Sequence, residues 1–135
     1  MIENIKNNEK NILRKSIDVL KSNGVLGIVP DQDVDSVDGV FVDFFGKRTY
    51  TPAGPVIMAL LTAAPVVQSF VVRKNGKLHL YIEGPFYFNK THDRKADIVR
   101  YTQEWSKTLE RYIRKYPSNW VWMHKRWKTQ PKANA

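Results

Sequence analysis

The chain contains no cysteine among its 135 residues. Disulfide bonds, thiol catalysis and cysteine-ligated metal sites are therefore excluded. The amino-terminal end has neither the apolar centre nor the small-residue cleavage site of a secretory signal, so we expect no export. Residues 49–72 carry no charge, but Pro52, Pro55 and Pro65 interrupt them, and we expect no transmembrane segment in this chain.

Charge of one sign is missing from two parts of the chain. No acidic residue follows Glu110, where a basic arm consists of Arg111, Arg114, Lys115, Lys125, Arg126, Lys128 and Lys132. No basic residue lies between Lys21 and Lys47, where the acidic residues are Asp31, Asp33, Asp35, Asp38 and Asp43. The basic arm and the net charge of +9 suit anionic lipid headgroups, phosphorylated substrates, acidic carrier proteins or nucleic acid. Tryptophans interleave with the basic residues, which favours a peripheral membrane surface, and without a nucleic-acid motif we expect no nucleic-acid partner.

The hydrophobic pattern predicts an α/β fold. Helical spacing predicts helices over residues 7–22, 53–63 and 94–116, with Gly24 suited to a left-handed stop of the first. The continuous apolar run Val25–Val29 predicts a parallel strand that is buried on both faces. A hydrophobic content of 42% suffices for a core, so we expect one domain over residues 1–135.

Two further segments are rich in residues that favour strands. Residues 66–72 and 78–83 predict a hairpin, because Asn75-Gly76 between them is a strong turn signal. Residues 40–45 predict a strand or a packed surface loop that ends at Gly46. With the buried strand and the helices, these segments predict a mixed sheet flanked by helices.

Asp31 and Asp33 follow the predicted buried strand directly. In open α/β sheets ligands bind outside the carboxyl ends of the strands, so these carboxylates are candidates for accepting hydrogen bonds from sugar hydroxyls or for holding arginines. The alternative is an acidic turn that caps the next element. The spacing Asp31-x-Asp33-x-Asp35 also begins a calcium-loop pattern, but Ser36 and Val42 replace the required Gly and Glu, so we expect no metal site.

His92 and Asp97 match the spacing His-x-x-x-x-Asp, in which an aspartate orients a histidine that acts as general base. On one helix, five residues of about 100° each would place them on different faces. The match therefore leaves the catalytic residues unknown.

The closing stretch reads Trp120-Val121-Trp122-Met123-His124-Lys125-Arg126-Trp127-Lys128-Thr129. Taken by itself, this stretch predicts a Trp-rich strand that packs on the sheet with solvated basic residues. The alternative, a binding role for its basic residues, rests on the resemblance that follows.

This closing motif, the segment Val29-Pro30-Asp31-Gln32-Asp33 and the segment Gly39–Gly46 occur in an order that resembles the bacterial lipid A late acyltransferases. These lauroyl and myristoyl transferases belong to the lysophospholipid acyltransferase superfamily. Family members carry a membrane-anchoring helix and a catalytic His-x-x-x-x-Asp before the part that this chain resembles. The resemblance therefore covers the carboxyl-terminal half alone, and we expect the usual dyad to be absent from this chain.

The resemblance implies transfer of a fatty acyl group from an acyl-carrier-protein or coenzyme A thioester to a hydroxyl of a lipid A precursor or other anionic glycolipid, without a cofactor. It places Asp31 and Asp33 near the active site and assigns His124, Lys125 and Arg126 to the lipid acceptor. It also implies a peripheral location on the cytoplasmic face of the inner membrane. The alternative is a non-catalytic module that binds anionic lipid or a carrier protein. Strands missing from such a half leave apolar surface exposed, so we expect a homo-oligomer or pairing with an amino-terminal half.

Overall fold

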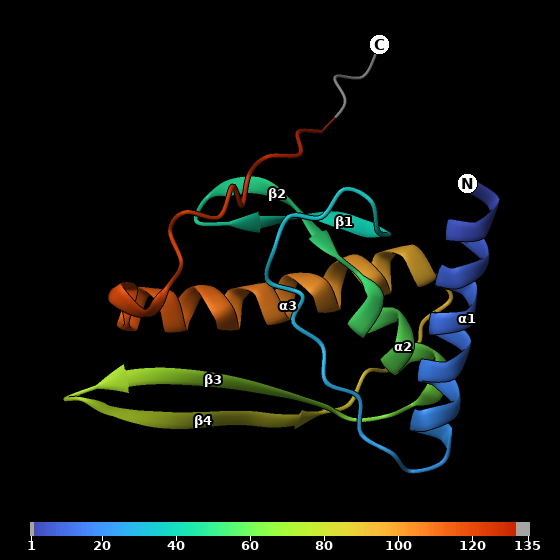
Figure 1. The fold of residues 1–135 in the computed structure, drawn as a ribbon, viewed down its shortest axis with the longest axis horizontal. Helices are drawn as coiled ribbons and strands as arrows, with labels where there is room; N and C mark the ends of the chain where they lie inside the picture. Colours follow the sequence, from blue (N-terminus) through green and yellow to red (C-terminus); the bar gives the residue numbers. More distant parts are fainter. Residues whose placement is uncertain (1, 132–135) are drawn as a thin grey trace.

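The computed structural model describes residues 2–131, with side chains from residue 10 onward, so Lys132 of the basic arm lies outside it. The chain is a mixed α/β structure, as the sequence predicts. Its elements are α1 (Ile2–Lys21), β1 (Gly39–Phe44), β2 (Lys47–Pro52), α2 (Gly54–Thr62), β3 (Val66–Lys74), β4 (Lys77–Phe86), α3 (Arg94–Lys115) and the 3₁₀ turn η1 (Pro117–Asn119). In Figure 1, α3 runs through the middle, with the β1–β2 hairpin above it and the β3–β4 hairpin below, while α1 lies at the far end from η1.

The three predicted helices are confirmed. After α1, the backbone N–H of Gly24 donates to the carbonyl of Val19 at 2.8 Å. The left-handed residue at this stop is Asn23, with a φ of 60°, and not Gly24 as predicted. Asparagine tolerates the left-handed region better than most residues do, so it serves as the cap.

The predicted hairpin is also confirmed. Strands β3 and β4 pair in antiparallel register up to Lys74 and Lys77, and Asn75 and Gly76 between them have φ values of 52° and 73°. Both central residues of a type I′ turn require positive φ, which the Asn-Gly pair provides at little cost.

A second hairpin was not predicted. Strand β1 pairs with β2 through a turn at Phe45 and Gly46, whose φ values are 54° and 75°. A phenylalanine rarely adopts positive φ, so the pattern gave no turn signal. Tertiary contacts hold Phe45 there: its N–H donates to Glu110 Oε2 at 2.9 Å, and the guanidinium of Arg114 lies 4.6 Å from its ring centroid.

The predicted buried strand at Val25–Val29 is wrong. This segment has no regular secondary structure, and Val25 and Val29 are 93% and 84% exposed. A parallel strand needs neighbouring strands, whereas the strands within residues 2–131 form two separate two-stranded antiparallel sheets. The closing stretch is likewise a series of turns and not a strand.

The core forms along one face of α3. The helix contributes Tyr101, Trp105, Leu109 and Ile113, which pack with Phe44 of β1 and with Val56 and Leu60 of α2. Each such buried side chain contributes about 1.5–3 kcal/mol. Trp120 and Trp127 pack against this cluster from the carboxyl-terminal side, which brings the closing stretch onto the body of the protein.

Candidate functional site

The acidic loop, residues 31–38, and the closing segment, residues 120–129, lie against each other. Asp33 accepts hydrogen bonds from both the N–H and the hydroxyl of Thr129, at 2.7 and 2.6 Å. Lys128 Nζ lies 3.3 Å from a carboxylate oxygen of Asp35. Opposite charges from distant parts of the sequence therefore form one surface. The two hydrogen bonds of Asp33 hold the acidic loop against the closing segment.

His124 joins this contact. Its Nε2 atom lies 3.4 Å from the side-chain nitrogen of Gln32, within reach of a hydrogen bond when the ring nitrogen is unprotonated. The His124 ring is half-buried, and Lys125 beside it is exposed. The geometry therefore brings two of the predicted site residues, Asp33 and His124, to the same loop-to-loop contact, with Lys125 at its edge. The carboxylates of Asp31 and Asp33 also lie near Arg126.

Arg126 is buried, with 1% of its surface exposed. Its guanidinium donates to Thr49 Oγ1 at 2.9 Å, to the Tyr50 carbonyl at 2.7 Å and to Thr51 Oγ1 at 2.7 Å. The Thr49 hydroxyl in turn donates to the carbonyl of Arg126. Arg126 therefore anchors the closing segment to β2, and its direct contact with an acceptor stays a prediction.

The acidic loop also supplies charge to this anchor. Burial lowers the pKa of Arg126 from its ordinary value, while the nearby carboxylates of Asp33 and Asp31 oppose that shift. One carboxylate oxygen of Asp31 is buried and has no hydrogen-bond partner among residues 10–131. A buried acceptor without a donor is costly, so Asp31 is available to a ligand hydroxyl or amide.

Asp31 also lines an apolar cleft of about 450 Å³. The cleft is bounded by α2, α3, β3 and residues 26–31, and its lining includes Leu26, Val56, Phe70, Trp105 and Trp120. Pockets of this size with mainly apolar walls and few polar groups are typical of small-molecule sites. A hydrocarbon chain suits this lining, with Asp31 available to a polar group beside it.

Comparison with known proteins assigns these segments to a family. The sequence model of the bacterial lipid A biosynthesis acyltransferases matches residues 2–129. The chain belongs to this family. The resemblance predicted from the three motifs is thus confirmed.

Individual relatives in the lipid A acyltransferase family agree. The chain is 26% identical over 125 residues to the lipid A biosynthesis palmitoleoyltransferase of Escherichia coli K12, and 29% identical over 124 residues to the lauroyltransferase of the same organism. Each match covers 90% of this chain and 39% of the relative. The chain is also 26% identical over 112 residues to a phosphatidylinositol mannoside acyltransferase of Mycolicibacterium smegmatis. This match covers 80% of the chain and 34% of that protein. The chain thus spans well under half the length of these relatives.

His92 and Asp97, the formal match to an acyltransferase dyad, do not form a hydrogen-bonded pair in the described structure. Asp97 is 2% exposed and accepts hydrogen bonds from the N–H and the hydroxyl of Thr91, at 2.6 and 2.9 Å, and from Arg100 at 3.0 Å. The backbone hydrogen bond from Thr91 is the main reason that the pKa of Asp97 is lowered. His92 is exposed, and Asp97 serves to order the start of α3 in this member of the lipid A acyltransferase family.

Sequence reasoning missed three site residues in this lipid A acyltransferase family member. Thr49 and Thr51 alternate along β2 so that both hydroxyls face Arg126, and Thr129 holds Asp33. The alternation Thr-x-Thr was visible, but β2 itself was not predicted. Among residues 10–131, no three His, Asp or Glu side chains are close enough together to hold a metal ion.

Proposed function

We propose that this chain is part of an acyltransferase that moves a fatty acyl group from an acyl-carrier-protein or coenzyme A thioester to a hydroxyl of a lipid A precursor or related glycolipid. The family match over residues 2–129 carries the proposal. The apolar cleft beside Asp31 supports it, because an acyl chain and a polar acceptor must meet at one place.

Each part of the site has a role in this proposal. The cleft holds the acyl chain, and the free carboxylate oxygen of Asp31 accepts a hydrogen bond from a sugar hydroxyl of the acceptor. Lys125 faces the phosphate groups of a lipid A precursor, since cationic donors bind phosphate strongly, and His124 beside it can add a ring N–H donor. Asp33 and Arg126 position these groups by clamping the closing segment.

Acyl transfer also requires a general base. The acceptor oxygen attacks the thioester carbonyl, its proton passes to the base, and the carbon–sulfur bond breaks to release the thiol. The chain has three histidines, His79, His92 and His124, and none hydrogen-bonds a carboxylate among the described side chains. We therefore expect the oriented histidine to come from a polypeptide segment outside this chain.

The location follows from the same proposal. No helix within residues 2–131 is both long and apolar enough to cross a membrane. A lipid acceptor lies in a bilayer, so we expect peripheral attachment at the cytoplasmic face of the inner membrane.

A second candidate is a non-catalytic module that binds anionic lipid or an acyl-carrier protein. The absence of a paired histidine among the described residues favours it. The basic arm, which has no acidic residue after Glu110, would serve either function.

Acyl transfer from labelled acyl-carrier-protein thioester to a lipid A precursor tests the proposal. The chain is assayed alone and with an added amino-terminal segment of a lipid A acyltransferase, and His92→Ala is run alongside. Activity only with the added segment, unaffected by His92→Ala, is the expected result. Activity of the chain alone that His92→Ala abolishes would refute the assignment of the base.

Asp31→Asn then tests the acceptor role in the active mixture. The change keeps the size of the side chain but removes its charge, so we expect the apparent affinity for the acceptor to fall about tenfold. Asp38→Asn, an exposed aspartate in the same loop, is the matched control. Equal effects of the two changes would show that the loop acts only through its total charge, and binding without transfer in every mixture would support the binding module.

A further inference from the structure

Residues 121–125 project from the protein between two fixed points. Trp120 packs against the core, with its ring centroid 6.4 Å from that of Phe44, and Arg126 is held inside by β2. Backbone hydrogen bonds tighten the bend between them, from Trp122 N to the Trp120 carbonyl at 3.1 Å and from His124 N to the Val121 carbonyl at 3.2 Å. The projection is therefore held in position by its ends and by its own turns.

The outward side of this projection is apolar. Val121, Trp122 and Met123 are 49%, 60% and 89% exposed. The indole N–H of Trp122 donates to the Pro117 carbonyl at 2.8 Å, so the protein satisfies its one polar atom and leaves the ring in solvent. Consecutive exposed apolar side chains, held in place, mark a surface that contacts an apolar partner.

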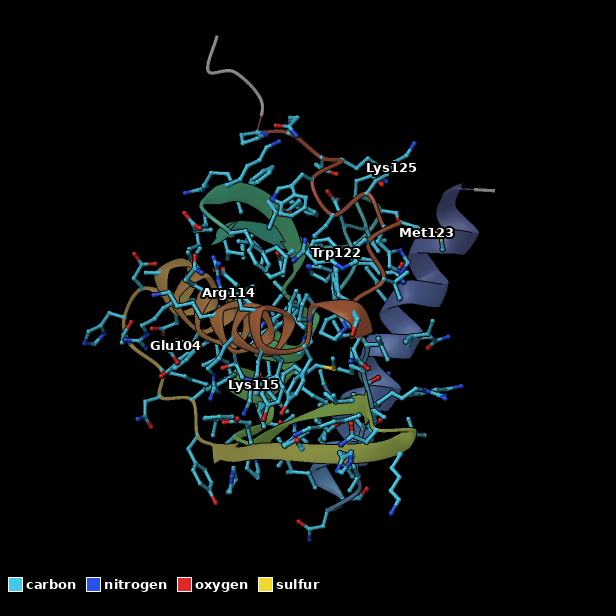
Figure 2. All side chains as sticks on the ribbon, turned by 90° about the vertical axis from the view of Figure 1, so that its left-hand side faces the viewer. Glu104, Arg114, Lys115, Trp122, Met123 and Lys125 are labelled. Atoms are coloured by element: carbon cyan, nitrogen blue, oxygen red, sulfur yellow. The ribbon has the colours of Figure 1, made fainter. Side chains whose placement is uncertain are left out.

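A basic side chain follows these residues directly, while the acidic loop, residues 31–38, contacts the closing segment further along, at Lys128 and Thr129. The side chain of Lys125 is exposed and has no hydrogen bond or ion pair among the described residues, and Figure 2 shows it near Trp122 and Met123 on the closing segment. Lys115 at the end of α3 appears on the same side of the molecule, whereas Arg114 beside it is paired with Glu110 at 2.6 Å. The partner must therefore combine an apolar phase with negative charge.

We propose that Val121, Trp122 and Met123 enter the headgroup region of an anionic phospholipid bilayer while Lys125 binds lipid phosphate. Tryptophan prefers this interfacial depth, and an apolar group beside basic residues is the usual pattern of peripheral attachment. The inference builds on the proposed membrane location and does not depend on acyl transfer. It would also bring the apolar cleft to the bilayer, because Trp120 at the base of the projection lines that cleft.

Sedimentation with vesicles of phosphatidylcholine, with and without phosphatidylglycerol, tests this surface. Met123→Ser is the main variant because it keeps every described hydrogen bond, and we expect it to weaken binding to anionic vesicles about tenfold. Lys125→Gln removes one cationic contact and should weaken binding about fivefold. Raising the salt concentration should weaken the wild type more than Lys125→Gln.

Ile12→Ser and Lys15→Gln are the matched controls. Ile12 is 60% exposed, like Trp122, and both residues lie on α1, away from the closing segment in Figure 1. We expect both controls to bind as the wild type does. The proposal would be overturned if the controls lost as much affinity for anionic vesicles as the tested variants. It would also be overturned if the wild type bound equally well to vesicles with and without phosphatidylglycerol.

Trp122 offers a direct readout of contact. Phospholipids brominated near the glycerol should quench part of the protein fluorescence, and Trp122→Phe should remove most of that quenching. Quenching that persists in Trp122→Phe, or a wild type that binds no vesicles, would show that these residues face another partner. Because no turnover is measured, an inactive chain can still bind as expected, and an active chain that ignores vesicles refutes this inference alone.

Discussion

Arg126→Ala should lower the free energy of unfolding substantially, because the Arg126 side chain is buried and forms hydrogen bonds with β2. The change removes three hydrogen bonds from a charged donor, at 2.7 to 2.9 Å, and leaves the Thr51 hydroxyl and the Tyr50 carbonyl without this donor. The Thr49 hydroxyl keeps its hydrogen bond to the backbone carbonyl of residue 126. Hydrogen bonds of this kind contribute about 1.5 kcal/mol each at the low end, or about 4.5 kcal/mol together. Removing a buried charge recovers part of that cost, so we expect the free energy of unfolding to fall by about 3 kcal/mol.

Urea unfolding followed by tryptophan fluorescence and circular dichroism measures this change. Lys125→Ala is the adjacent control, and its effect should stay within about 0.5 kcal/mol because Lys125 is exposed. Arg126→Lys keeps the charge, but an ammonium group cannot span the acceptors as the planar guanidinium does, so we expect a loss of about 2 kcal/mol.

A double-mutant cycle with Thr51→Val isolates one of the contacts. We expect a coupling energy of about 1–2 kcal/mol between Arg126 and Thr51, which share a hydrogen bond of 2.7 Å. A loss below about 1 kcal/mol for Arg126→Ala, or a coupling of zero, would refute the reasoning that this guanidinium anchors the closing segment.

Three further predictions concern other contacts. Asp33→Ala should lower the free energy of unfolding by about 1–2 kcal/mol in urea, because Thr129 loses the acceptor of two hydrogen bonds. The Thr91 hydrogen bonds lower the pKa of Asp97 in the folded protein. The ionised carboxylate therefore contributes its full stabilisation above the unfolded-state pKa, and this contribution is lost as the pH falls through the folded-state pKa. In Asp97→Asn, the melting temperature should consequently decrease less than in the wild type as the pH falls below about 4. Light scattering should show self-association through the outer face of β3–β4, where Val71 and Leu80 are 62% and 61% exposed, and Leu80→Lys should reduce it.

Each of these has an outcome that contradicts it. Asp38→Ala should leave stability unchanged, and an effect equal to that of Asp33→Ala would mean that loop charge alone matters. An Asp97→Asn variant with the acid sensitivity of the wild type would assign that sensitivity to another carboxylate. A wild type that stays monomeric at every concentration would show that the exposed sheet face does not pair copies of this chain.

The parts of the fold that were predictable depend on neighbours in the sequence. The Asn75-Gly76 turn and the regular apolar spacing along α3 are local signals, and the structure confirms both. The β1–β2 hairpin was missed because Phe45 is held at positive φ by Glu110 and Arg114, which are distant in the sequence. Val25–Val29 has the composition of a buried strand, but composition cannot supply the strand beside which it would pair.

The candidate site divides in the same way. The sequence by itself determined the family motifs, the separation of acidic and basic segments and the choice of Asp31, Asp33, His124, Lys125 and Arg126 as candidates. Only the tertiary structure decided which of them meet, because the contacts join residues more than ninety positions apart. From the sequence alone, an arginine can be predicted equally well to lie on the solvated surface or to be buried and hydrogen-bonded, because its acceptors are not known. The fold placed Arg126 inside against Thr49 and Thr51 and left Trp122 outside, since only one side of the closing segment faces the core.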